Sequence, residues 1–424
     1  SGTGYKITNQ FGDADLNSYG EKLVTYLSRS DWQGTWPVSY ASLTANDAII
    51  NGLQFNYTAE APDETVIMGS TATNYTLANL IGKDYDDPMW VDLLNQLTLT
   101  DLAELVGHSG YGTRAIDSIG LPATVAADGP QGIKATYAGN NSTVAYTSEP
   151  VMAATFNTEI LYNVGLSMGE DALRSDNRVV GWYGPAMNIH RTPYSGRNFE
   201  YYSEDGILTG LIDARETVGI QSKGVYVYNK HFVLNDQENN RAGIGTWCNE
   251  QALREIYLRA FELPIIQADA QCVMTAFNRL GAIWAGAYTE LLTDWLRGEA
   301  GMSGFAVTDM YDGTYMVKVN EIVAGNDLPD NFVGEDISEL KDYGPDGAKA
   351  NPMVAQALRT SAKRVLNTVV NSRGMDGISQ YTRVVREATW WQLTLNIAQW
   401  ALGALTAVAF VLVVLDGKKK GAKK

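Results

Sequence analysis

The sequence predicts an α/β fold built on a (β/α)8-type barrel, with an N-terminal extension and a C-terminal transmembrane helix. Two observations predict the barrel: short apolar runs alternate with helix-length segments along the middle of the chain, and the run at 305–308 leads directly into Asp309. A parallel barrel places its functional groups at the carboxyl ends of its strands. The third observation is an uncharged stretch near the C-terminus with the length of a membrane span. An open doubly wound sheet is the alternative fold.

The predicted elements follow from hydrophobic periodicity and end signals. The polar first part of the chain contains one clear strand candidate, 23–27. Apolar residues at helical spacing start after Pro88, and a second helix is expected near Leu99 with Thr98 or Thr100 as its N-cap. The strands expected after Gly120 are 180–189 with its loop, 224–230, 272–277 and 305–308, and the helices are 208–222, 249–268, 291–300 and 354–370.

These elements divide the 424-residue chain into five regions. No self-contained core is evident before the barrel, and the chain begins with Ser1, so we expect it to be part of a longer protein. The expected regions are the tail of an upstream domain with a linker (1–84), the barrel domain (85–375), a juxtamembrane linker (376–387), the transmembrane helix (388–415) and a basic cytoplasmic tail (416–424).

Composition argues against several classes of function. The chain has 48 acidic and 32 basic residues, a formal charge of −16, which disfavours a nucleic-acid partner because no basic face could neutralise phosphates. Two cysteines, Cys248 and Cys272, and three histidines provide neither a disulfide framework nor a metal-ligand cluster. The sequence contains no glycine-rich phosphate loop. We therefore expect no metal or organic cofactor.

The C-terminal region predicts membrane insertion. Residues 388–415 contain no charged side chain, which favours a lipid-facing helix over a buried helix of a soluble protein. Trp390, Trp391 and Trp400 are of the type enriched at membrane interfaces, and the lysine-rich end is of the type retained in the cytoplasm. We therefore expect a single-pass protein of the cell membrane with its barrel outside the cell.

Polar motifs lie where several strands are expected to end. Asp128 begins an Asp-Gly-Pro turn, Lys230 and His231 follow a strand candidate, and Arg197 lies in an aromatic and acidic run. Each motif alone has an ordinary explanation as a turn, a cap or a surface cluster. The blocks occur in one order, at 128–133, 188–193, 196–205, 230–232, 274–278 and 304–309.

Together these blocks, within residues 85–375, resemble glycoside hydrolase family 3, in its β-glucosidase-like branch and with permuted domain order. The loop after His231 lacks the Gly-His-Gly and Asp-x-His patterns of the family's N-acetylglucosaminidases. The resemblance implies that Asp309 is the catalytic nucleophile. It implies substrate-binding roles for Asp128, Arg197, Lys230, His231 and Phe277. Cationic donors and carboxylates suit sugar hydroxyls, and Arg197 and Lys230 are expected to keep Asp309 ionised.

Two residues depart from the family pattern. Met310 follows the nucleophile where this branch usually has Trp, and Lys134 replaces an Arg after the Asp-Gly-Pro turn. The general acid/base of the family is usually a Glu on a separate sandwich domain, which we expect upstream or on another chain. The candidates within this chain for a substitute acid are Glu200, Glu204 and Glu238.

The predicted function is that of a retaining β-glycosidase, a hydrolase of β-linked glucosides or oligosaccharides that forms a covalent glycosyl-enzyme on Asp309. Because the acid/base is expected elsewhere, we expect this chain alone to be weakly active or inactive. The alternatives are a membrane-anchored sugar-binding subunit without catalysis and a transmembrane structural protein. The expected partners are the substrate, the sandwich domain and membrane lipid.

Overall fold

The computed structural model describes residues 1–26, 44–54, 66–134, 143–331, 336–344, 350–382 and 389–421. The chain forms two compact units, Ser1–Tyr381 and Thr382–Lys424. The first contains a parallel sheet with its surrounding helices, and the second contains one long helix.

The central sheet is parallel, and its strands follow one another in chain order. Within the described residues its strands are β1 (Ala126–Asp128), β2 (Gly181–Tyr183), β3 (Tyr226–Phe232), β5 (Cys272–Thr275), β8 (Ala306–Met310) and β9 (Leu328–Asp330). In a doubly wound sheet the spatial order of the strands reverses partway along the chain. In a barrel the spatial order follows the chain throughout. The alternative fold is therefore wrong, and the chain has the α/β architecture of a curled parallel sheet.

The two edge strands of the sheet are bridged by residues 110–113. The Gly110 amide donates to the Asn331 carbonyl (2.8 Å), just beyond β9. The Ala126 amide of β1 donates to the Tyr111 carbonyl (2.9 Å). Backbone hydrogen bonds therefore connect β9 to β1 through an irregular segment, although the described strands of this sheet number six where eight were expected.

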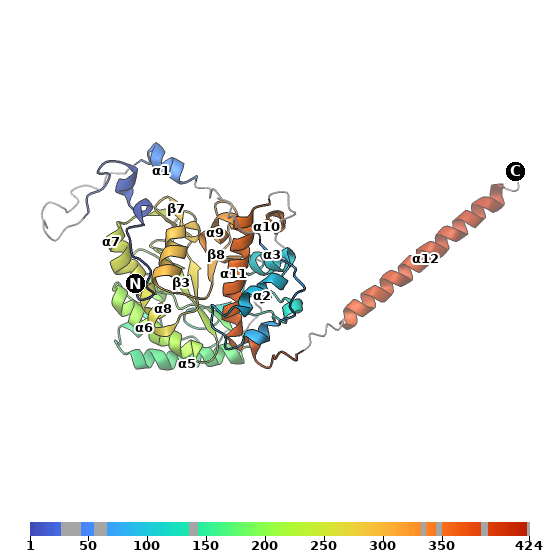
Figure 1. The fold of residues 1–424 in the computed structure, drawn as a ribbon, viewed down its shortest axis with the longest axis horizontal. Coiled ribbons are helices and arrows are strands. Elements are labelled where there is room, and N and C mark those ends of the chain that lie inside the picture. Colours follow the sequence, from blue (N-terminus) through green and yellow to red (C-terminus); the bar gives the residue numbers. More distant parts are fainter. Residues whose placement is uncertain are drawn as a thin grey trace. The chain divides into compact units, whose positions relative to one another are not determined.

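Helices surround these strands in Figure 1. Their bounds are α1 (Asp47–Gly52), α2 (Met89–Gln96), α3 (Leu99–Gly107), α4 (Glu149–Ala153), α5 (Thr158–Arg174), α6 (Gly206–Gln221), α7 (Glu250–Ala252), α8 (Leu258–Ala268), α9 (Lys318–Ala324), α10 (Ser338–Asp342) and α11 (Pro352–Val370). Two π-helical segments are present, Leu253–Tyr257 between α7 and α8, and Glu290–Glu299. Thr98 is the N-cap of α3, in a capping box with Asp101, because its hydroxyl accepts from the Asp101 amide.

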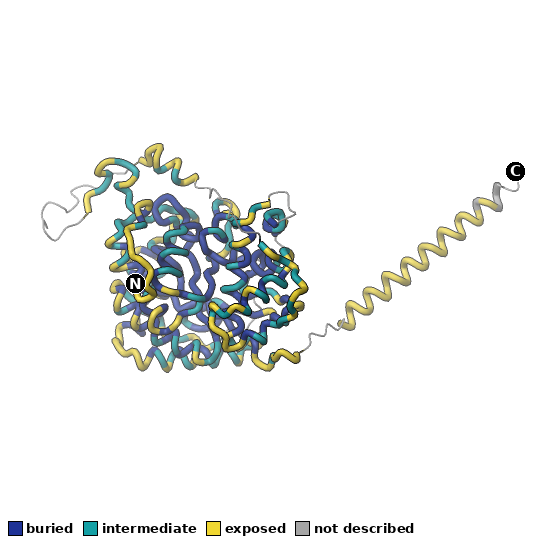
Figure 2. The backbone as a smooth tube through the Cα atoms, viewed as in Figure 1, coloured by how far each residue is buried: buried dark blue, intermediate teal, exposed yellow. Residues whose placement is uncertain are grey.

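Side-chain alternation along the strands sets the direction of the polar groups at their ends. Tyr183, Tyr228 and Phe305 fill the interior of the ring, with centroid distances of 4.7 Å and 5.4 Å between successive rings. Residues two apart on a strand point to the same side. Lys230 follows Tyr228 by two positions and Asp309 follows Phe305 by four, so both side chains point into the ring above these aromatics. Figure 2 shows the buried backbone at the centre of this unit.

The strand predicted at 23–27 is wrong in its described part, and Leu27 lies outside the described residues. Residues 23–26 form no strand because the amide and carbonyl of Val24 are satisfied by the side chain of Asn17 at 3.0 Å each. The start of the chain packs instead as an extended segment. Phe11 is fully buried against Tyr288, and the Gln10 amide donates to Glu250 of α7 (3.0 Å).

Several features of the first unit were not predicted, and two of them have a clear physical reason. Helix α5 was missed because its Gly165 and Gly169 interrupt a helical pattern. These glycines permit close packing on α6, since a Cβ at Gly165 would lie 2.1 Å from the Glu216 carbonyl oxygen. A small sheet of β4 (Gly245–Thr246), β6 (Arg279–Leu280) and β7 (Ile283–Trp284) was also missed, because two-residue strands carry no readable periodicity.

The second unit consists of α12 (Trp390–Gly421). Its segment Trp390–Asp416, 27 residues long, is long and apolar enough to cross a membrane by length and composition, and none of it is buried within the protein. Figure 2 shows this helix exposed along its described length.

Candidate active site

A cavity of about 290 Å³ opens at the carboxyl ends of the strands. It is lined by Tyr111, Asp128, Tyr183, Arg197, Lys230, His231, Arg241, Met274, Phe277, Asp309, Met310 and Asp330. All six predicted site residues are among them, although they are spread over 182 positions of the chain, from 128 to 309. A second cavity of about 490 Å³, which includes Glu170, Arg178 and Arg373 in its lining, contains none of the six.

Asp128 and Lys230 form an ion pair across two strands. Asp128 ends β1, and the Lys230 ammonium donates to its Oδ1 at 2.6 Å. The Gly129 amide donates to the same oxygen (2.9 Å). Burial acts to raise the pKa of Asp128, but Lys230, with Lys134 and the Gly129 amide, outweighs burial and lowers it. Asp128 is therefore an ionised acceptor in the cavity.

The turn after Asp128 requires glycine. Gly129 has φ +134°, and a Cβ there would lie 1.8 Å from the Gly132 carbonyl oxygen. The Asp-Gly-Pro motif thus places a carboxylate and a tight backbone turn together at the cavity. The turn could be recognised in the sequence because it requires glycine.

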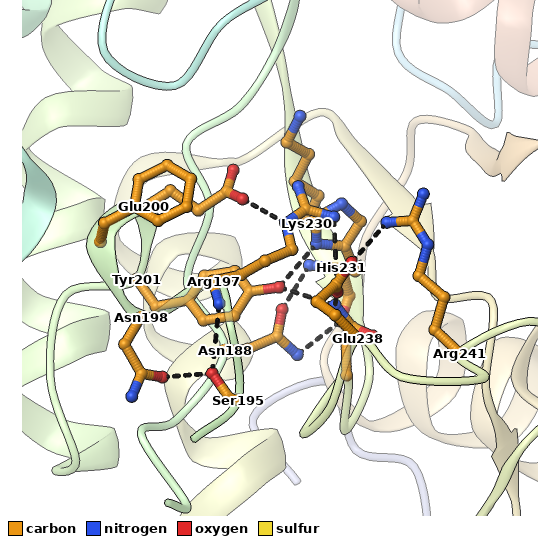
Figure 3. A network of polar contacts seen from close by, with 12 residues as sticks. Asn188, Ser195, Arg197, Asn198, Glu200, Tyr201, Lys230, His231, Glu238 and Arg241 are labelled. Atoms are coloured by element: carbon orange, nitrogen blue, oxygen red, sulfur yellow. Dashed lines mark hydrogen bonds and ion pairs between the residues drawn. The ribbon is translucent and has the colours of Figure 1, made fainter. Parts of the chain in front are cut away.

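Arg197 is held by two glutamates in the network shown in Figure 3. Its Nε donates to Glu200, and its Nη1 lies 3.8 Å from Oε1 of Glu238. Glu238 also accepts from Arg241 (2.9 Å). The guanidinium is therefore positioned at the cavity wall with its charge balanced from outside the cavity.

His231 is fixed in position by hydrogen bonds on the far side of its ring and through its backbone. The Asn188 side chain accepts from the His231 amide (2.7 Å) and donates to its carbonyl (2.8 Å). The Tyr201 hydroxyl lies 3.1 Å from Nδ1 and itself accepts from Asn235 (2.8 Å), so its proton is directed to Nδ1. That assignment leaves Nε2–H facing Asp309, whose Oδ2 is 3.5 Å away.

The His231–Asp309 contact is not an ion pair. Burial, together with Arg197, Lys230 and Arg241, lowers the pKa of His231 well below its usual value, so the imidazole is neutral. Burial also raises the pKa of Asp309, while Arg197, the Met310 amide, Lys230 and Arg241 oppose that shift. The cations therefore act in the expected direction on Asp309, but burial has the larger effect and the net shift is upward.

Met310 lines the more open side of the cavity, and the mostly buried Phe277 adds an aromatic ring to the lining. Arg241 lies over the Phe277 ring, 4.5 Å from its centroid. Met310, in the place where the family usually has Trp, is 40% exposed. Met274 on β5 adds a second thioether to the lining, so this wall is apolar and adaptable.

The three glutamates considered as substitute acids do not line the cavity. Glu200 and Glu238 are paired with arginines, and Glu204 is exposed at the surface. Sequence reasoning missed a different carboxyl, Asp330, which lines the cavity at the end of β9.

Asp330 has the same kind of signal that led to Asp309, an apolar run that ends in an acid. The run at 328–329 is too short to be recognised as a strand without its partner β8. Tyr111 and Tyr183 were missed because tyrosines are common in cores and are not informative singly. Within the described residues no group of three or more His, Cys, Asp or Glu side chains is arranged to hold a metal ion.

Comparison with known proteins places these motifs in one family. The profile of the glycosyl hydrolase family 3 N terminal domain matches residues 98–325. The chain is 36% identical over 237 residues to probable beta-glucosidase I of Aspergillus clavatus, covering 55% of this chain and 28% of that protein. It is 36% identical over 246 residues to beta-glucosidase A of Butyrivibrio fibrisolvens, covering 56% and 29%. The chain thus spans less than a third of the length of these curated relatives.

Solved structures agree with this relationship. Beta-glucosidase 3B from Thermotoga neapolitana in complex with glucose matches 68% of this chain and 43% of its own chain, with a TM-score of 0.60 and 35% identity. The beta-glucosidase of Bifidobacterium adolescentis matches 69% and 42%, with a TM-score of 0.61 and 29% identity. Since the family profile alone covers more than half of its residues, the chain belongs to glycoside hydrolase family 3.

Proposed function

We propose that this chain is the catalytic barrel of a retaining β-glycosidase, a (β/α)8-type domain in which Asp309 attacks the anomeric carbon of a β-linked glucoside. One observation carries the proposal: six side chains from five separate motifs, Asp309 among them, converge on one cavity. Support also comes from the relatives, which are described as beta-glucosidases.

The proposed roles follow from charge and position. Asp128 accepts from sugar hydroxyls, while Arg197, Lys230 and the His231 Nε2–H donate to sugar oxygens. In the first step an Asp309 oxygen forms a bond to the anomeric carbon as the bond to the leaving oxygen breaks. Water then cleaves the glycosyl ester with net retention. The raised pKa of Asp309 is a cost of burying the nucleophile, and the three nearby cations limit it.

The general acid/base is proposed to come from a sandwich domain, upstream in the same polypeptide or on another chain. The three glutamates that could replace it lie outside the cavity lining. Retaining hydrolysis needs an acid about 5 Å from the nucleophile to protonate the leaving oxygen. Poor leaving groups therefore require that second domain, whereas a leaving group that departs without a proton does not.

Covalent trapping tests the nucleophile independently of the acid. The full chain in detergent is incubated with 2,4-dinitrophenyl 2-deoxy-2-fluoro-β-glucoside, whose leaving group needs no proton. We expect mass spectrometry to locate one adduct on Asp309. Asp309→Asn should reduce trapping by on the order of 10⁴-fold or more. The matched control Asp312→Asn, three residues further along and outside the cavity lining, should trap normally. An adduct on another residue, or unchanged trapping by Asp309→Asn, contradicts the assignment.

A membrane anchor is the second part of the proposal. We infer that 388–415 spans the membrane with 416–424 in the cytoplasm and the barrel outside, as the apolar length and the terminal lysines suggest. Carbonate extraction of membranes should leave the chain in the pellet. External protease should cleave the barrel but not a tag placed after Lys424. Release by carbonate, or digestion of the tag in intact cells, would exclude this topology.

The second candidate function is a membrane-anchored sugar-binding subunit without catalysis. It is favoured by the absence of Glu200, Glu204 and Glu238 from the cavity lining. The trapping experiment separates the two candidates, because a binding subunit would bind glucose without acquiring an adduct.

A further inference from the structure

The cavity contains a third carboxyl that the proposed mechanism does not use. Asp330 ends β9, the strand beside β8, and its register partner on that strand is Met310. It is only 4% exposed, whereas Met310 is 40% exposed. Asp330 therefore lies in the more closed part of the cavity lining, and Met310 lies in the more open part.

Hydrogen bonds fix the orientation of this carboxyl. Its Oδ1 accepts from the Tyr183 hydroxyl at 3.0 Å and from the Tyr111 amide at 3.2 Å. The Asp330 amide donates to the Thr308 hydroxyl on β8 (2.8 Å). Within the described residues its Oδ2 has no hydrogen-bond partner, although the residue lines the cavity. Because Oδ1 is occupied by two donors, a proton on the neutral acid is carried by Oδ2 and faces the cavity.

We propose that Asp330 is a specificity-determining residue of the sugar pocket, a neutral carboxylic acid whose Oδ2–H donates a hydrogen bond to a hydroxyl of the sugar ring held above Asp309. This inference rests on the proposed function, because it requires that the cavity takes a sugar. A buried donor at the closed end discriminates against sugars that lack the matching hydroxyl, since it would then remain unpaired.

The charges around Asp330 favour the neutral form. Burial raises its pKa to about 7, opposed by the Tyr111 amide and the Tyr183 hydroxyl and reinforced by the carboxylates of Asp309 and Asp128. No cation contacts it within the described residues, in contrast to Asp128, which Lys230 neutralises. A bound sugar removes further water and so stabilises the neutral acid over the carboxylate. Sugar binding is therefore expected to weaken as pH rises through about 7.

Calorimetric titration of the full chain with D-glucose, at pH values from about 5.5 to 8.5, tests the proposal. In the wild type we expect Kd to rise roughly tenfold across this range, the scale of one lost hydrogen bond. Asp330→Asn retains an acceptor for Tyr183 and Tyr111 and presents a permanent N–H donor. Its Kd should match the low-pH wild-type value within about threefold and stay constant with pH. Asp330→Leu should bind weakly at every pH. Asp309→Asn should keep a slope, displaced to lower pH because the Asp309 carboxylate no longer reinforces the raised pKa of Asp330.

The possible outcomes are distinct. A wild-type Kd that is flat or falls with pH, or an Asp330→Asn variant that keeps the wild-type slope, overturns the inference while leaving the proposed function intact. If the slope is lost in Asp309→Asn but not in Asp330→Asn, the pH dependence belongs to Asp309, and the inference about Asp330 is overturned as well. If no form of the chain binds glucose at any pH, the proposed function fails and the inference fails with it. Because Asp330→Asn conserves shape, it decides the question even if Asp330→Leu does not fold.

Discussion

Asp128 and Asp309 line the same cavity and are both partly buried, but their pKa values move in opposite directions. Asp128 has the Lys230 ammonium at 2.6 Å. Asp309 has a neutral imidazole at 3.5 Å, and its cations act from further away. The difference suits the two proposed roles. A group that binds sugar hydroxyls functions best as a fixed carboxylate, whereas a nucleophilic carboxylate loses its negative charge when it bonds to the anomeric carbon.

The comparison teaches that the count of nearby cations does not decide the protonation of a buried acid. Arg197, Lys230 and Arg241 all favour the ionised form of Asp309, yet burial prevails. For Asp128 a directly hydrogen-bonded cation, aided by Lys134 and the Gly129 amide, overcomes the same kind of penalty. Contact distance is the deciding quantity, since the interaction of two charges is strongest where no water separates them.

Removing Lys230, the cation in contact with Asp128, should give the largest of the expected effects. Lys230→Met leaves Asp128 buried without its partner, so its pKa should rise, as that of Asp309 does. We expect a loss of about 2–4 kcal/mol in the free energy of unfolding at pH 7, measured by urea denaturation. A lowered folded-state pKa contributes stability above the unfolded pKa of about 3.9 and loses it as pH falls, so the deficit should shrink below about pH 4.

Two controls sharpen this test. Lys223→Met removes a more exposed pair with Glu170, at 3.4 Å, and should cost less than about 1 kcal/mol. The double variant Lys230→Met with Asp128→Asn should recover part of the loss, because no buried charge remains. A Lys230→Met variant as stable as the wild type would show that the ion pair does not determine the behaviour of Asp128.

Neutralising Asp309 should have the opposite effect on stability. A raised folded-state pKa means that the stability contributed by Asp309 is complete below about pH 3.9 and is lost as pH rises through the folded pKa. Asp309→Asn should therefore stabilise the fold by about 1 kcal/mol at pH 8 and give no gain near pH 3.5, measured by thermal and urea unfolding. Asp336→Asn, at an exposed acid whose pKa is lowered by the Ser338 amide, should not stabilise the protein. A destabilised Asp309→Asn at pH 8 would contradict the upward shift.

Removing Arg197, a cation that acts on Asp309 from a distance, should give the smallest of the expected effects. Arg197→Met takes away the cation that most opposes the raised pKa of Asp309, so the acid limb of the trapping rate should move to higher pH. Loss of the proposed hydrogen bond to the sugar should slow trapping at every pH, and at about pH 5 the rate should fall by a further several-fold relative to pH 8. Arg197→Lys retains the charge and should restore the limb partly. An identical limb in Arg197→Met would show that this cation is too distant to influence Asp309.

Many residues that line the cavity could be predicted because the sequence patterns that indicate them are local. A strand that ends in an acid, as at Asp309, and a turn that requires glycine, as after Asp128, are visible in a few adjacent residues. Strand 23–27 failed because a strand needs a partner, and here the Asn17 side chain satisfies the backbone of Val24. Helix α5 was missed because its close packing on α6 depends on a segment distant in sequence. Asp330 was missed because pairing with β8 likewise depends on a distant segment.

By itself the sequence determined the α/β class, the family, the apolar C-terminal helix and six residues that share one cavity, since each depends on composition, spacing or short motifs. Only the tertiary structure decided that the ring is bridged by 110–113, that Asp330 joins the cavity, and that Asp309 is harder to ionise than Asp128. The physical reason is that burial and charge proximity are set by which strands lie side by side, and a short stretch of sequence does not specify its neighbours in the sheet.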